Sequence, residues 1–311
     1  MDEREGHRCA ALTTFTDGEA SRFHAVPGTL YVVATPVGNL RDVTLRALDI
    51  LGTVDVVAAE DTRVTAVLLR HFGIAARPLS LHEHNEATRA ARIVGMLGEG
   101  RSVALVSDAG TPAVSDPGAL LVRAVRDAGF AVVPIPGANA AIAAVSAAGL
   151  TAPHFLFLGF LPATAKARRD ALIAVAALPY ALVFYEAPHR VGATLDALID
   201  VLGGERELTI ARELTKKFEP IARLPLAEAT AWLAADPNRR RGEFVLLVDA
   251  PKPGTGAAGA PAPSPETGRW LRALLDELPP SRAARVVAAM TGEPRDRLYA
   301  RALAMKPGAP E

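Results

Sequence analysis

The chain of 311 residues is poor in several features that would define its class at once. Its single cysteine, Cys9, cannot form an internal disulfide, so we expect a protein of the reducing cytoplasm. Its apolar runs are short, and none approaches the ~20 residues of a membrane span. The charged residues 1–5 lack the apolar core of a signal peptide. Basic and acidic residues balance at 34 each, so binding to nucleic acid would have to come from local patches.

Familiar catalytic motifs are missing as well. The sequence contains no P-loop, no HExxH, no CxxC and no GxSxG, which removes most support for NTP hydrolysis, zinc proteolysis and α/β-hydrolase chemistry. Residues 254–259 match GxGxxG, but a dinucleotide fingerprint needs a helix that opens directly after its strand. Five prolines between 251 and 265 exclude a helix there, so we reject this segment as a cofactor site.

What the chain does have is a repeated unit, in which a short apolar run ends in a turn rich in proline and glycine and a helix pattern follows. Ligands of open α/β sheets bind outside the carboxyl ends of the strands. One such turn is an ordinary connection, whereas several in register favour a shared ligand crevice. The runs and their turns are 30–34 with 35–39, 103–106 with 107–118, and 132–135 with 136–140.

Alternating strand and helix patterns predict an α/β fold with two α/β domains and a mostly parallel first sheet. The expected parts are a disordered extension (1–28), a first domain (29–150), a second domain (151–250), a Pro/Gly/Ala linker (251–265) and a small helical domain of three helices (266–311). The expected strands are 30–34, 54–58, 103–107 and 132–135, then 155–159, 181–186, 207–212 and 243–249, with helices near 62–72, 166–178 and 188–201.

Two polar clusters lie in the predicted first domain. Glu60, Asp61 and Arg63 suit a capped helix start and the rim of the crevice equally well, and both interpretations stay open. His82 and His84 alternate as on a strand face, which is one way to bind a metal. Because no third soft ligand is evident, we favour capping or contact with RNA and expect no metal.

Local excesses of positive charge stand out on a neutral chain. Residues 212–217 hold three cations and a carboxylate, and we favour a site for an anionic substrate there over a solvated hairpin. Solvated helix faces would explain any single cluster, but together the clusters suggest a phosphate track with salt-dependent affinity. Tyr185, His189, Phe218 and Trp232 are available to stack on splayed bases. The candidate RNA-binding cations are Lys166, Arg168, Arg169, Lys217, Arg239 and Arg240.

Seven segments in one order resemble the tetrapyrrole methylase superfamily, and within it the branch that acts on ribosomal RNA. The resemblance covers about residues 29–250. The segments are 35–40, 59–63, 82–86, 107–118, 159–162, 184–190 and 211–216.

The resemblance implies a two-domain methyltransferase that holds S-adenosylmethionine in the cleft between its domains. It also implies 2′-O-methylation of a cytidine ribose in the decoding region of 16S ribosomal RNA, with the 30S ribosomal subunit as partner, and a homodimer. The cofactor residues expected from it and from the strand-end turns are Pro36, Gly38, Asp108, Gly110, Thr111, Ala138, Asn139, Ala140, Tyr185, Ala211 and Gly242.

A ribose hydroxyl is a poor nucleophile at neutral pH and needs a base, or cations that favour the alkoxide. Our catalytic candidates are Lys216, Arg212 and Glu213, with a lysine of lowered pKa as the base. Two alternatives remain: a methyltransferase of the same superfamily that acts on a small molecule such as a precorrin, and a non-enzymatic RNA-binding protein. The second choices for the base are Glu60, Asp61 and His84.

Overall fold

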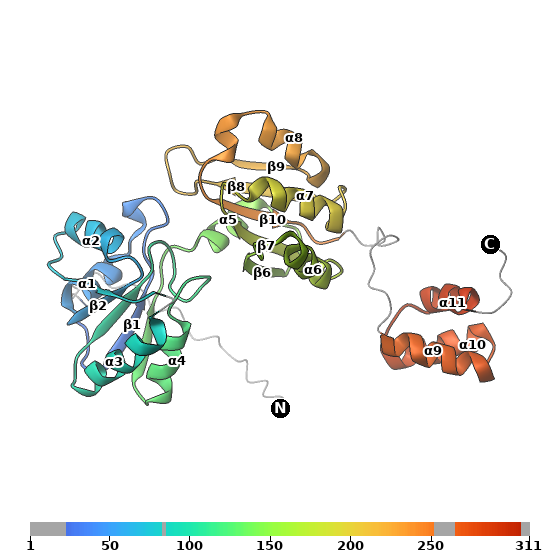
Figure 1. Cartoon of the computed structure of the whole chain (residues 1–311), viewed down its shortest axis with the longest axis horizontal. Coiled ribbons are helices and arrows are strands. Elements are labelled where there is room, and N and C mark those ends of the chain that lie inside the picture. The colour runs from blue at the N-terminus through green and yellow to red at the C-terminus, as the bar shows by residue number, and fades with distance from the viewer. Residues whose placement is uncertain (1–22, 83–84, 252–264, 306–311) are drawn as a thin grey trace, which may run out of the picture.

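The computed structural model describes residues 23–82, 85–251 and 265–305. Two five-stranded sheets with helices form two α/β domains, and three further helices follow in the C-terminal segment (Figure 1). The predicted α/β class, with paired α/β domains and a C-terminal helical segment, is therefore confirmed. No helix in the described part of the chain is long and apolar enough to cross a membrane.

The first sheet is entirely parallel, in the order β3-β2-β4-β1-β5. Its strands are β1 (Thr29–Val33), β2 (Val56–Ala59), β3 (Leu79–Ser80), β4 (Val103–Val106) and β5 (Ala131–Ile135). The helices that follow them are η1 (Leu40–Asp42), α1 (Leu45–Thr53), α2 (Thr62–His71), α3 (Glu86–Gly98) and α4 (Ala119–Asp127).

Both faces of this sheet are covered, as a parallel sheet requires. Every residue of β4 is buried, and successive side chains alternate between two cores. Ala104 and Val106 pack with α1 and α2, while Val103 and Leu105 pack with α3 and α4. This double burial explains why β4 appears in the sequence as a continuous apolar run.

The second sheet is mixed, in the order β6-β7-β10-β8-β9, with only β6 and β7 parallel. Its strands are β6 (Phe155–Phe160), β7 (Ala181–Glu186), β8 (Glu207–Arg212), β9 (Ile221–Pro225) and β10 (Phe244–Val248). Its helices are α6 (Ala165–Val175), α7 (Val191–Leu202), η2 (Leu226–Glu228), α8 (Ala229–Ala234) and η3 (Pro237–Arg240).

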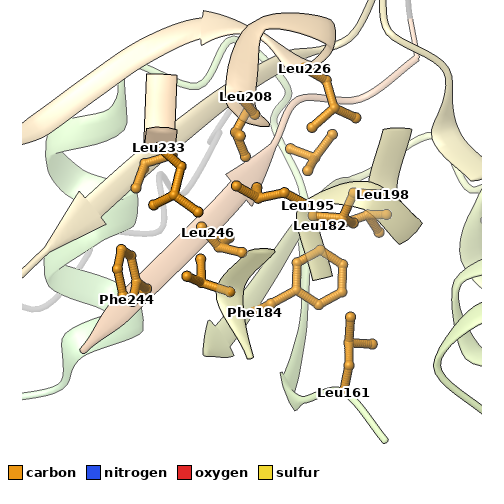
Figure 2. Close-up of a cluster of buried hydrophobic side chains, with 14 of the residues drawn as sticks. Leu161, Leu182, Phe184, Leu195, Leu198, Leu208, Leu226, Leu233, Phe244 and Leu246 are labelled. Atoms are coloured by element: carbon orange, nitrogen blue, oxygen red, sulfur yellow. The ribbon is translucent and has the colours of Figure 1, made fainter. Parts of the chain in front are cut away.

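The sequence patterns find four of these five strands. They miss β9, which lies at the sheet edge and ends in a proline that cannot donate to a ladder. The main core of this domain joins β7, β8 and β10 to α7 and α8, with Phe184 and Leu246 at its centre (Figure 2).

The helix α5 (Ala140–Ala148) connects the two domains in a way that the sequence does not reveal. Its Ala141, Ala144 and Ala148 pack on the second sheet, against Val183 and Val245 among others, although the predicted boundary at residue 150 assigns α5 to the first domain (Figure 1). The proline at 153 breaks the chain locally, whereas packing is decided by the small side chains of α5. The chain therefore passes between the domains directly after β5.

The described ends of the predicted parts also differ slightly from expectation. Residues 23–28, predicted to belong to the extension, are attached to α1, since the amides of Phe23 and Ala25 donate to Asp49 and Thr53. Residues 1–22 and most of the predicted linker (252–264) lie outside the described residues. The three expected C-terminal helices are α9 (Pro265–Glu277), α10 (Pro280–Thr291) and α11 (Arg295–Ala304), which share a core around Leu271.

The buried ring of Phe184 provides a test of the second core. The Phe184→Ala variant is expected to lose about 3–5 kcal/mol of unfolding free energy, because it leaves a cavity among aliphatic side chains that cannot collapse fully. Urea unfolding measures this loss. Phe155→Ala, on the same sheet but 40% exposed, is the matched control and should cost much less. Equal losses in the two variants would contradict this description of the core.

Candidate active site between the two domains

The loops at the carboxyl ends of β1, β4 and β5 are joined by hydrogen bonds. The Thr35 amide donates to the Gly110 carbonyl at 2.8 Å, and the Gly110 amide donates back at 2.9 Å. The Thr35 hydroxyl donates to the Ser107 carbonyl, and the Thr111 hydroxyl to the Ala138 carbonyl. The strand-end turns that the sequence predicts to lie together therefore do so.

A cavity of about 450 Å³ lies beside these loops. Strand ends of the first domain supply one side, including Val37, Asp108 and Asn139, and the second domain supplies Tyr185 and Val245 among others. The Tyr185 hydroxyl accepts a hydrogen bond from the Ala141 amide at 3.1 Å, which holds the start of α5 against β7. This volume falls in the usual range for small-molecule sites, about 300–1,000 Å³.

Three carboxylates of the first domain face this cavity: Glu60 after β2, and Asp108 and Asp116 in the loop after β4. Burial is the main cause that raises the pKa of each, and nearby negative charges add to it: Asp108 and Asp61 act on Glu60, and Asp61 acts on Asp108. For Asp116, burial followed by the negative charge of Glu60 raises the pKa to about 6. The cavity therefore concentrates negative charge in a partly desolvated place, which suits a cationic ligand.

Two further carboxylates touch the cavity but already have partners. Glu186 is buried, accepts from the Thr194 hydroxyl at 2.6 Å and pairs with Arg190. Glu243 pairs with Lys216. Both carboxylates are thus occupied by contacts within the second domain.

Glu86 shapes the long loop after β4, a role that the sequence patterns miss. This buried side chain on α3 accepts from the amides of Gly118, Leu120 and Leu121 with one oxygen. The helix α4 has no side-chain cap of its own, so Glu86 satisfies its first amides from a neighbouring helix. A glutamate at the start of its own helix suggests only a local capping role.

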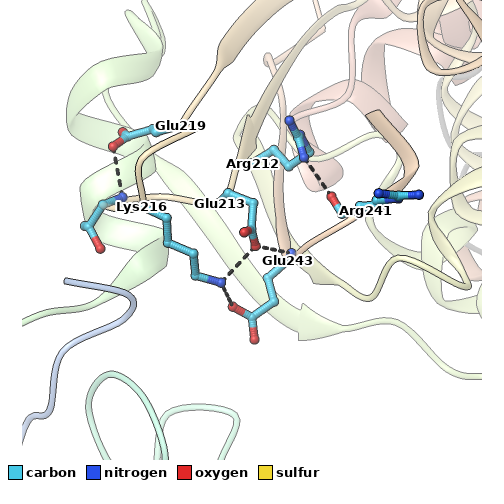
Figure 3. A network of polar contacts seen from close by, with 7 residues as sticks. Arg212, Glu213, Lys216, Glu219, Arg241 and Glu243 are labelled. Atoms are coloured by element: carbon cyan, nitrogen blue, oxygen red, sulfur yellow. Dashed lines mark hydrogen bonds and ion pairs between the residues drawn. The ribbon is translucent and has the colours of Figure 1, made fainter. Parts of the chain in front are cut away.

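The second domain meets the first through the segment after β8. The Lys216 ammonium group lies 2.8 Å from Glu213 and 3.1 Å from Glu243 (Figure 3). A methyl group on Gly38 would lie 2.6 Å from Cγ of Lys216 and 3.0 Å from the Leu214 carbonyl. Only glycine fits where the loop after β1 passes this segment.

These ion pairs bear on the predicted catalytic role of Lys216. Burial by itself lowers the pKa of Lys216, but the hydrogen bonds to Glu213 and Glu243 and their charges outweigh it and raise the pKa overall. The same contacts hold the pKa of Glu213 below its usual range despite burial. The expected lowering of the Lys216 pKa is therefore not what these contacts produce, because the two ion pairs favour its cationic form.

Six of the eleven expected cofactor residues line the cavity, and the other five lie elsewhere. Gly38 lies at the domain contact, and the Ala138 carbonyl supports Thr111. Ala211 is fully buried in the core against α5. Gly242, in the left-handed region, packs against Glu213, and Pro36 lies beside Val37 in the first loop. Those that face the cavity are Asp108, Gly110, Thr111, Asn139, Ala140 and Tyr185.

The candidate RNA-binding cations come from three segments of the second domain. At the start of α6, Lys166 pairs with Asp170 and Arg169 lies 4.0 Å from Asp200. Arg168 is buried there and donates to the Ala163 carbonyl, so it is not part of a surface track.

The other two segments, 217 and 239–240, lie near residues that line the cavity, Leu214 and Glu243. Arg239 stacks over the Trp232 ring, with 4.5 Å to its centroid, while Arg240 is exposed. Lys217 lies beside Phe218 after β8. The Arg212 guanidinium donates to the Arg241 carbonyl and so ties these two segments together (Figure 3).

The histidine cluster is only partly described. His82 contacts the Asn85 side chain at 3.0 Å, which fits a local structural role, and His84 lies outside the described residues. In the other polar cluster of the first domain, Asp61 caps α2 and pairs with Arg63. Within the described ranges no group of three His, Cys, Asp or Glu side chains could hold a metal ion.

The fold thus consists of paired α/β domains with an acidic cavity of small-molecule size between them, at the strand ends of the first sheet. The family model for tetrapyrrole (corrin/porphyrin) methylases matches residues 29–230, and that for the RsmI C-terminal HTH domain matches residues 261–306. The chain therefore belongs to the tetrapyrrole methylase family, in the group whose members are named ribosomal RNA small subunit methyltransferase I.

Relatives with that name share half of their residues with this chain. The protein from Vibrio cholerae serotype O1 is 50% identical over 87% of this chain and 92% of its own length. The protein from Escherichia coli O157:H7 is 50% identical over 89% and 95%. A solved structure, that of the methyltransferase CobJ, is 24% identical over 72% of this chain and 94% of its own, with a TM-score of 0.54, and shows the shared fold.

The contact at Gly38 can be tested by adding a single methyl group. Gly38→Ala should lower the unfolding free energy by about 1–3 kcal/mol, because Leu214 and Lys216 must move to admit it. Chemical denaturation measures the change. The control, Gly52→Ala in the exposed part of α1 with open space around it, should be neutral or stabilising by up to about 1 kcal/mol. Equal tolerance at both positions would contradict a tight domain contact.

Proposed function

We propose that this chain is an S-adenosylmethionine-dependent methyltransferase that modifies the ribose 2′-hydroxyl of a cytidine in the decoding region of 16S ribosomal RNA. Its partner in this proposal is the small ribosomal subunit, and it acts as a homodimer. The observation that carries the proposal is the acidic cavity between the domains of a tetrapyrrole methylase fold. The choice of ribosomal RNA as substrate follows the names of relatives that match nearly the whole chain.

The residues of the cavity fit the cofactor. S-adenosylmethionine, when bound, supplies an activated methyl group on a sulfonium. Asp108, Asp116 and Glu60 provide the negative charge that the sulfonium and the amino group of such a ligand favour. Val37 and Val245 offer apolar contact, and no phosphate-binding lysine is needed. This combination explains why the strand-end loops are rich in small residues and acidic side chains and lack a P-loop.

Asp116 suits the role of proton acceptor for the ribose hydroxyl. It faces the cavity from the first domain, and its pKa of about 6 makes it a stronger base than an ordinary aspartate while leaving it mostly ionised at neutral pH. Lys216, whose pKa is raised, is suited to hold a phosphate or to stabilise an oxyanion, and the Arg212 guanidinium lies in the same segment.

The proposed function is tested with small ribosomal subunits from a bacterial strain that lacks the homologous enzyme. The wild-type chain should transfer labelled methyl groups from S-adenosylmethionine to 16S RNA, and ribose-methylation mapping should locate them on a cytidine. Asp108→Asn should weaken cofactor binding about tenfold or more in calorimetry, because it removes one charge and keeps the acceptor oxygen.

Asp127→Ala, on the exposed end of α4, is the control and should bind the cofactor normally. Failure of the wild-type chain to methylate the particles would contradict the proposed methyltransferase activity. Unchanged cofactor affinity in Asp108→Asn would remove Asp108 from the site.

The role of Asp116 predicts a particular pH dependence. A carboxyl of raised pKa is protonated and inactive as a base at low pH, so the single-turnover rate should rise with pH through about 6 and then level off. Asp116→Asn should reduce the rate by roughly 10²–10⁴-fold and abolish this limb. Glu60→Gln should move the limb to lower pH, because the negative charge of Glu60 helps to raise the pKa of Asp116. An unaltered profile in both variants would exclude the proposed proton acceptor.

A further inference from the structure

The loop that joins β8 to β9, residues 213–220, presents an aromatic side chain to solvent. Phe218 is 73% exposed, more than any other Phe, Tyr or Trp in the described ranges. The Lys217 ammonium lies over its ring, 5.5 Å from the centroid. Because exposure of a large apolar ring is unfavourable in water, a partner that covers Phe218 gains binding free energy.

The loop holds this ring in a defined place. The Thr215 amide donates to the Glu219 carboxylate at 2.9 Å, and the Arg212 amide donates to the Pro220 carbonyl at 3.1 Å. Glu213 and Thr215 adopt left-handed backbone angles, with φ of 51° and 66°. Non-glycine residues adopt such angles only where the surrounding contacts impose them. A partner that binds Phe218 therefore finds a loop that is already ordered.

The loop also adjoins the proposed active site. Leu214 lines the cavity, and four residues of chain place Phe218 at most about 14 Å beyond it. Lys216, between them, contacts Glu243 at the cavity edge (Figure 3). Through Arg212, the loop is also tied to the basic segment 239–241, in which Arg240 and Arg241 are exposed. The Phe218 ring and the nearby cations thus lie close enough to the cavity for one RNA strand of a few nucleotides to contact both.

We propose that Phe218 and Lys217 form a stacking platform for an unpaired RNA base next to the nucleotide that enters the cavity. The inference rests on the proposed function and adds the RNA contact that the cavity itself does not explain. The base stacks on the ring face away from Lys217, whose ammonium pairs with a neighbouring phosphate. Aromatic rings bind splayed bases in this way, and cations beside them hold the backbone. A second protein copy fits less well, because the core of such an interface is depleted in charge.

The test measures binding of unmethylated small ribosomal subunits to the full-length chain by filter binding. Phe218→Ala should raise the dissociation constant at least about fivefold, the loss expected for one stacked base. Phe218→Trp should retain affinity, whereas Phe218→Leu, apolar but without a π face, should lose it. Lys217→Ala should reduce the slope of log K against log[salt] by about 0.7, the value for one phosphate of a single strand. Calorimetric affinity for the cofactor should stay unchanged in all four variants.

Phe155→Ala is the matched control, since Phe155 is also an exposed phenylalanine but lies at the opposite end of β6 from Phe160 of the cavity. It should bind the particles as the wild type does. Wild-type affinity in Phe218→Ala or in Phe218→Leu overturns the platform. A change of oligomeric mass in Phe218→Ala, measured by light scattering, also overturns it and assigns the face to contact between copies. Particles bound through Phe218 but not methylated by the wild-type chain would contradict the proposed function and leave the platform standing.

Discussion

The reciprocal backbone hydrogen bonds between Thr35 and Gly110 are the constraint on which the site depends. They join the loops after two adjacent parallel strands, β1 and β4, and so fix the long loop that carries Asp108 and Asp116. Backbone groups make this link, and Gly110 adopts a left-handed φ of 82° in it. Gly110 itself lines the cavity. These hydrogen bonds therefore help to set where Asp108 and Asp116 lie relative to the second domain.

The two domains contribute different chemistry to the cavity. The first supplies carboxylates whose pKa values are raised by burial, and the second supplies aromatic rings and a lysine, Lys216, whose charge is held by ion pairs. The helix α5 connects them, since it leaves the first sheet after β5 and packs on the second. The carboxylates of the first domain favour a cationic ligand on their side of the cavity.

Part of this site could be predicted from the sequence. Turns of small residues after β1, β4 and β5 indicate a common crevice, because the carboxyl ends of neighbouring parallel strands lie at one edge. The sequence could not show that the pKa of Asp116 is raised or that ion pairs raise the pKa of Lys216. Burial is the main cause at Asp116 and Glu213 is a close neighbour of Lys216, but Glu60 and Glu243, which lie 56 and 27 positions away along the chain, add to the shifts only in the folded protein.

The α/β class, eight of the ten strands and the small-residue turns follow from local patterns, since periodic burial and backbone propensity act over a few residues. The tertiary structure alone decided that α5 packs on the second sheet, that Glu86 caps a neighbouring helix and that Arg168 is buried. Each of these depends on contacts between segments that are distant in sequence. The burial of a side chain and the Coulomb energy between two charges depend on distances in space, and the order of residues along the chain does not give these distances.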